Sequence, residues 1–158
     1  MRDDPPISSE AAITAGMSGA NTRWTNAEFF IVGLNGGHGV LSIADGAQLT
    51  SGNWAAVGYG AGTTGELTIS GPGSRWTIQE QLDIAIVGGQ AVVTLVNSGE
   101  LHSIGPMTVY AGARIRGDGI LRPANIINEG LLEPGAGVGI LHIQSSVTQS
   151  DAAGLEIE

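Results

Sequence analysis

Apolar and hydroxyl side chains alternate along short stretches of this chain, and the alternation returns at a fixed interval. The tripeptides Leu41-Ser42-Ile43, Leu67-Thr68-Ile69 and Val93-Thr94-Leu95 each lie 26 residues from the next. A period of two residues places the apolar groups on one face of a β-strand and the hydroxyl group on the other. Each tripeptide is followed by a turn that contains glycine. The pattern therefore predicts short β-strands that are separated by tight turns.

A second interval supports the repeat. Arg23-Trp24-Thr25 returns as Arg75-Trp76-Thr77 after 52 residues, and the same 52 residues separate Leu49 from Leu101. Short alternating strands are compatible with an antiparallel sandwich or a propeller blade, but their equal phase favours a parallel β-helix. In that fold, equivalent residues of successive coils stack about 4.8 Å apart.

We therefore predict an all-β fold, a parallel β-helix (β-solenoid) with coils of about 26 residues. The apolar members of the repeat should form one buried column, which contains Leu41, Leu67 and Val93. The hydroxyl members should lie on the outer face, as Ser42, Thr68 and Thr94.

The repeat divides the chain into three parts. Residues 1–12 form a polar lead-in, in which Pro5-Pro6 favours an extended conformation. Residues 13–118 form the repeat coils of the β-helix. Residues 119–158 lose the phase of the repeat but keep its alternation of short apolar runs and turns, which predicts further coils of different length.

Composition and charge exclude several function classes. The chain of 158 residues has a formal net charge of -9 and only six basic residues. We expect no nucleic-acid partner, because phosphates require clustered Lys and Arg, and the same deficit disfavours an anionic membrane surface. No apolar run reaches the roughly 18 residues of a membrane-spanning helix, so we expect no membrane insertion. The lack of Cys removes disulfides, thiolate metal sites and a Cys nucleophile.

Candidate catalytic groups show no convergence in the sequence. A β-helical polysaccharide lyase or glycoside hydrolase needs converging carboxylates, but the candidate acids are scattered along the chain. These acids are Asp45, Glu66, Asp83, Glu100, Asp118, Glu129 and Glu133. His38, His102 and His142 lie near turns or in outward phase, and no Gly-x-Ser-x-Gly nucleophile motif occurs. We expect no catalytic residue, no cofactor and no metal ion.

The three tryptophans are the remaining candidates for a binding role. Trp24, Trp54 and Trp76 are spaced about one coil apart and could stack on sugar rings. Trp24 and Trp76 share a repeat position, which favours a structural role at a coil corner, and Trp54 lies in a related position. We keep the three as candidate carbohydrate contacts.

Part of the sequence resembles a known repeat family. The stretch from Gly65 to Thr77, together with the glycine-rich run 57–65, resembles the repeat of bacterial autotransporter (type V secretion) passengers and PEP-CTERM surface proteins. The tail, residues 130–143 and 154–158, is similar to the coil that closes many such passengers. The resemblance implies a right-handed parallel β-helix that is exported and lies outside the cell or on the bacterial cell surface. The chain carries no signal or anchor segment, which favours a fragment of a longer protein.

Together, the repeat and the resemblance predict a non-enzymatic extracellular β-solenoid that serves as a surface stalk, an adhesin-type scaffold or a fibre subunit. Uncapped coils could continue onto a second molecule, so we expect head-to-tail self-association into fibres. Host or matrix glycans are candidate partners. The alternative functions are a β-helical polysaccharide-active enzyme and a carbohydrate-binding module.

Overall fold

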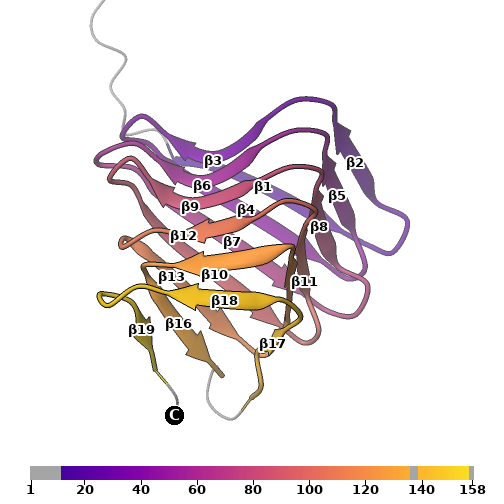
Figure 1. The fold of residues 1–158 in the computed structure, drawn as a ribbon. Helices are drawn as coiled ribbons and strands as arrows, with labels where there is room; N and C mark the ends of the chain where they lie inside the picture. Colours follow the sequence, from indigo (N-terminus) through magenta and orange to yellow (C-terminus); the bar gives the residue numbers. More distant parts are fainter. Residues whose placement is uncertain (1–11, 136–138, 157–158) are drawn as a thin grey trace, which may run out of the picture.

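The structure is a computed structural model and describes residues 12–135 and 139–156. Over these residues the chain forms three parallel sheets and no helix (Figure 1). Each strand pairs with the third strand after it, so the chain runs through the three sheets in turn and then begins the next coil. The result is a β-solenoid of about six turns with roughly 25-residue coils, which confirms the predicted fold.

The strands of one coil belong to three different sheets, which we call sheets A, B and C. Sheet A contains β1 (Ala12–Ser18), β4 (His38–Ala44), β7 (Thr64–Ser70), β10 (Gln90–Val96), β13 (Ala113–Gly117), β16 (Leu131–Pro134) and β19 (Gly154–Leu155). Sheet B contains β2 (Arg23–Asn26), β5 (Gln48–Ser51), β8 (Arg75–Ile78), β11 (Glu100–Ser103), β14 (Ile120–Pro123) and β17 (His142–Ile143). Sheet C contains β3 (Phe30–Leu34), β6 (Ala55–Tyr59), β9 (Leu82–Ile86), β12 (Met107–Val109), β15 (Asn125–Asn128) and β18 (Ser146–Gln149).

The register of sheet A follows the repeat that the sequence predicts. Leu41 pairs with Leu67 and Leu67 with Val93, and all three are buried, with exposed fractions of 2%, 1% and 0%. Their neighbours Ser42, Thr68 and Thr94 pair in the same way and are partly exposed on the outer face. The hydrogen-bonded ladder and the apolar column thus share one 26-residue period.

The hydrophobic core is a set of such columns that runs through the interior of the solenoid. Sheets B and C contribute columns of their own, because their inward positions also repeat from coil to coil. One column of sheet B contains Trp24, Leu49, Trp76, Leu101, Leu121 and Ile143. One column of sheet C contains Phe30, Ala55, Leu82, Met107, Ile126 and Val147. Burial of these side chains provides the main driving force for folding.

Coil length changes towards the C-terminal end. Residues 26 apart pair in sheet A up to β10, but Ala91 then pairs with Ala113, 22 residues on, and Arg114 pairs with Leu131, only 17 residues on. The coils therefore begin to shorten between β10 and β13, whereas the sequence pattern predicted the change at residue 118. Of the predicted lead-in, residues 1–11 lie outside the described residues, and β1 already includes residue 12.

The first coil leaves one side of β1, β2 and β3 without a partner strand among the described residues. At the other end, β17, β18 and β19 are the last strands of their sheets. In the part of the chain that the structure describes, no helix has the length and apolar character needed to cross a membrane.

Candidate binding surfaces

The three tryptophans occupy two different kinds of position. Trp24 and Trp76 both point inward from sheet B and belong to one column, with Leu49 between them. Trp76 is completely buried, and its Nε1 donates a hydrogen bond of 2.9 Å to Ser51 Oγ. Trp54 instead lies in the turn before β6 and is only partly buried.

The predicted relation between Trp54 and Trp24 is therefore wrong. Because Phe30 pairs with Ala55, the residue that occupies the position of Trp54 in the preceding coil is Phe29. Trp54 follows Trp24 by 30 residues, which is more than one coil. Since Trp76 is buried, the three indoles do not form an exposed row.

Aromatic side chains line the first coil of the solenoid. Phe30 packs edge-on against Trp24 at a ring distance of 5.1 Å and against Trp76 at 5.5 Å. T-shaped arrangements of this kind are favourable beyond their buried area. Trp24 remains 42% exposed because no described coil lies on its other side.

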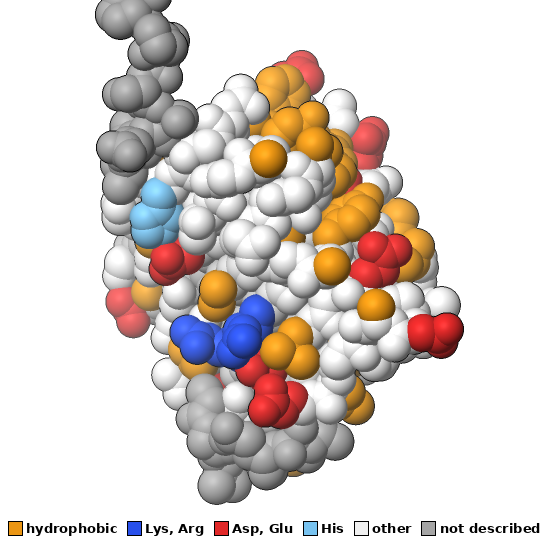
Figure 2. All heavy atoms as spheres, turned by 90° about the vertical axis from the view of Figure 1, so that its left-hand side faces the viewer, with side chains coloured by type: hydrophobic (Ala, Val, Ile, Leu, Met, Phe, Trp, Pro, Cys, Tyr) orange, Lys and Arg blue, Asp and Glu red, His pale blue; other side chains and the backbone are white. Residues whose placement is uncertain are grey.

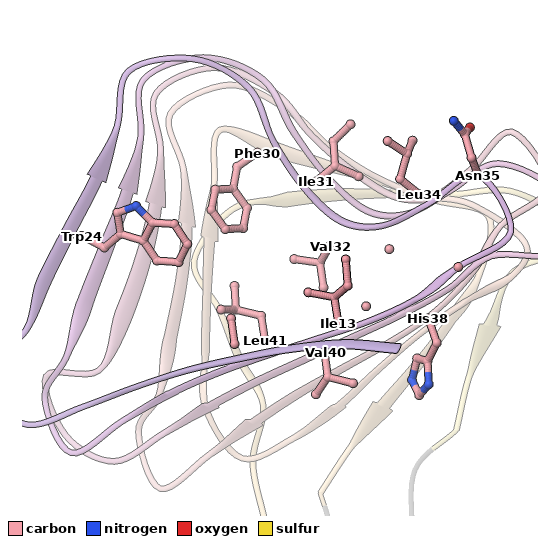
Figure 3. Close-up of a pocket in the computed structure, with 14 residues that line it drawn as sticks. Ile13, Trp24, Phe30, Ile31, Val32, Leu34, Asn35, His38, Val40 and Leu41 are labelled. Atoms are coloured by element: carbon pink, nitrogen blue, oxygen red, sulfur yellow. The ribbon is translucent and has the colours of Figure 1, made fainter. Parts of the chain in front are cut away.

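A cavity of about 700 Å³ opens at this end of the solenoid. Figure 3 shows the rings of Trp24 and Phe30 and the aliphatic side chains of Ile13, Val32 and Leu41 inside the outline of the coil. His38 lies at its edge and points away from the interior. The lining is apolar, so the cavity can hold apolar side chains and offers little to a charged ligand.

A second aromatic group lies on the outer face of sheet C, around Trp54. Its Nε1 donates a hydrogen bond of 2.6 Å to Asp83 Oδ2, a residue 29 positions later in the next coil. Gln81 Nε2 donates to both carboxylate oxygens of Asp83 at 2.8 Å. Tyr59 packs edge-on against the Trp54 ring, with the ring centroids 5.9 Å apart.

Asp83 is an outward-facing carboxylate that is nevertheless only 2% exposed. A buried charge is tolerated when hydrogen bonds satisfy it, and the indole and amide donors do so here. No sequence pattern indicates this contact, because Trp54 precedes its strand and Asp83 belongs to the next coil. Only the stacking of coils brings the two residues together.

Nearby carboxylates affect the pKa of Tyr110, which follows β12. Burial raises the pKa of its phenol above 10.0, and the carboxylates of Asp83 and then Glu129 raise the pKa further. Tyr110 is partly buried against the core, and its phenol can donate a hydrogen bond.

The outer faces of sheets A and B carry ion pairs instead of aromatic groups. On sheet A, His38 Nε2 lies 2.8 Å from Glu66 Oε1, and Arg114 donates to Glu133 over the same distance. On sheet B, Glu100 lies between Arg75 and Arg122, at 3.8 Å and 3.6 Å. Surface pairs of this kind contribute little to stability.

Figure 2 shows how these groups are distributed over one face of the molecule. The basic and histidine side chains visible in this view lie on the side of sheet A, next to acidic side chains. Hydrophobic side chains gather on the right-hand side of the view, which is the side of sheet C, whose strands lie in front in Figure 1.

His142 is exposed, as its outward phase predicts. Among residues 12–135 and 139–156, no three His, Asp or Glu side chains are grouped closely enough to hold a metal ion.

The described surface thus offers two candidate binding sites, the apolar cavity at the first coil and the aromatic face of sheet C. Comparison of the chain with protein-family models, with curated proteins and with solved structures finds no match.

Proposed function

We propose that this chain is a structural segment of an extracellular β-solenoid, which acts as a surface stalk or adhesin-type scaffold. The observation that carries the proposal is the continuity of the three parallel ladders over a buried apolar interior. Such stacking satisfies the internal backbone groups and excludes water, so each added coil extends a stiff rod. The resemblance to exported repeat proteins favours a place outside the cell.

We further propose that the open coils allow weak head-to-tail association. The edge strands β1, β2 and β3 expose backbone groups that a parallel strand could pair with, and the apolar cavity lies between them. Of the last strands at the other end, β17 and β19 have only two residues each and β18 has four. The two ends therefore match over few residues, and we expect association only at high protein concentration.

Light scattering over a dilution series tests this association. The expected result is an average mass that rises with concentration, and a monomer mass at every concentration would overturn it. Ile13→Lys places a charge at the cavity, where Ile13 is 70% exposed, and should abolish the rise. Val87→Lys is the matched control, because Val87 is 61% exposed but lies in the turn after β9.

A polysaccharide-active enzyme is the alternative from another class. Incubation of the protein with neutral and acidic polysaccharides, followed by an assay for new reducing ends or unsaturated products, separates the two functions. Turnover that scales with protein concentration would replace the scaffold proposal. Labelling of the protein on intact source cells, compared with disrupted cells, tests its location.

A further inference from the structure

We propose that the outer face of sheet C binds a neutral polysaccharide chain, with the indole of Trp54 as the main stacking surface. This inference goes beyond the scaffold role, because it assigns a ligand class to one face of the solenoid. It also does not depend on whether the solenoid associates end to end.

The first observation is that the Trp54 ring is fixed in place before any ligand arrives. Asp83 accepts the indole N–H at 2.6 Å, and Tyr59 forms a T-shaped contact with the ring. Asp83 is itself held by Gln81. A side chain that is already ordered loses little conformational entropy on binding, which favours affinity.

The second observation is that several large apolar side chains are exposed on sheet C. Phe29 occupies the same coil position as Trp54 in the preceding coil and is 62% exposed. Leu34 and Ile127, on strands of the same sheet, are 46% and 40% exposed. Leu34 pairs with Tyr59, so Phe29 and Leu34 of the first coil and Trp54 and Tyr59 of the second form one patch on sheet C, whereas Ile127 lies three coils beyond Trp54. The patch extends along β3 and β6 over about 17 Å, which suits a few sugar units of a chain-like ligand.

The third observation is the charge of this face. The sequences of β3, β6, β9, β12, β15 and β18 contain no Lys or Arg. The charged groups identified on this side are acidic, namely Asp83 and Glu129, which both act on Tyr110. An acidic polysaccharide would be repelled here, whereas a neutral one meets no opposing charge.

The fourth observation is the set of polar groups beside the aromatic rings. Thr108 follows Asp83 by one coil, pairs with it and is partly exposed. Tyr59 and Tyr110 are partly exposed as well. Sugar rings combine apolar C–H faces with hydroxyl groups at their edges. An aromatic surface bordered by hydroxyl groups therefore suits a sugar ligand better than it suits a protein partner with an apolar surface.

Affinity gel electrophoresis tests the proposal. The probes are hydroxyethylcellulose, glucomannan and laminarin as neutral polysaccharides and polygalacturonate as an acidic one. We expect at least one neutral polysaccharide, but not polygalacturonate, to retard the wild-type protein. Trp54→Ala should weaken this binding about tenfold, which corresponds to about 1.4 kcal/mol. Trp24→Ala is the matched control and should keep full binding, because Trp24 lies at the cavity of the first coil.

Phe29→Ala provides a second test, since Phe29 is exposed and its loss leaves the core intact. It should weaken binding severalfold even if Trp54→Ala does not fold, and circular dichroism establishes which variants are folded. The proposal is overturned if no neutral polysaccharide retards the wild-type protein, if polygalacturonate binds as well, or if Trp24→Ala loses as much binding as Trp54→Ala. Binding of an apolar dye that Trp54→Ala abolishes, without any retardation by polysaccharide, would assign the face to a protein partner instead.

Discussion

Single glycines close the corner at which the chain passes from sheet C to sheet A. Gly33 and Gly58 occupy the same position in successive coils and have φ angles of 80° and 75°. A Cβ atom at Gly58 would collide with the carbonyl oxygen of Gln90 at the start of β10. In the third coil this position is Ala85, which also has a positive φ of 63°. The left-handed conformation is thus a property of the corner, and glycine is needed where the next coil approaches closely.

Three alanine substitutions separate backbone strain from this close approach. Gly58→Ala should destabilise the protein by about 2 to 4 kcal/mol, because strain and collision combine. Gly62→Ala should cost about 1 kcal/mol, since Gly62 has a φ of 74° but no atom closer than 3.9 Å. Gly16→Ala should be nearly neutral, because nothing lies within 4 Å and its φ is not positive. Urea unfolding measures all three, and equal losses for Gly58→Ala and Gly62→Ala would contradict the role of the neighbouring coil.

At the scale of a single element, the inward column of sheet B alternates large and smaller side chains. Trp24, Leu49, Trp76 and Leu101 follow one another in register. Each tryptophan therefore has leucine as its neighbour in the next coil, and Phe30 of sheet C fills the space between the two indoles. The element depends on this alternation because a close-packed interior tolerates little change in volume.

The same substitution at two positions of this column tests how far burial decides stability. Trp76→Leu should destabilise by about 2 kcal/mol and Trp76→Ala by about 3 to 5 kcal/mol, because the ring is fully buried. Trp24→Leu should cost clearly less, since Trp24 is 42% exposed at the end of the column. Urea unfolding measures the loss of stability in all three variants. A loss for Trp24→Leu as large as that for Trp76→Leu would show that Trp24 is covered in solution.

For the molecule as a whole, stability should follow the number of neighbouring coils. Strands β7 and β10 have a parallel partner on both sides, whereas β1, β18 and β19 have one. All four residues of β18 are exposed. Repeat folds open from their ends, because each coil is stabilised mainly by its neighbours. Hydrogen exchange read by mass spectrometry should therefore show the strongest protection in β7 and β10 and the weakest in β18 and β19. Uniform protection along the chain would indicate a single cooperative unit instead.

The repeat could be recognised in the sequence because it consists of residues that every coil must contain. The spacing of Leu41, Leu67 and Val93 predicted both the ladder and the buried column of sheet A. Coil length was less predictable, since the shorter coils after β10 have no period of their own. The predicted position of Trp54 was wrong. Its sequence distance from Trp24 is the sum of one coil length and the shift from strand β2 to the turn before β6.

The sequence by itself determined the solenoid, its period and the side of each strand that faces inward, because alternation and repetition are local properties of the chain. Only the tertiary structure decided which side chains from different coils meet. It placed Trp76 in the interior, brought Asp83 to the indole N–H of Trp54 and left Phe29 exposed beside Trp54. These contacts join residues that are about one coil apart but differ in their position within the coil, so they depend on how the coils are offset in space.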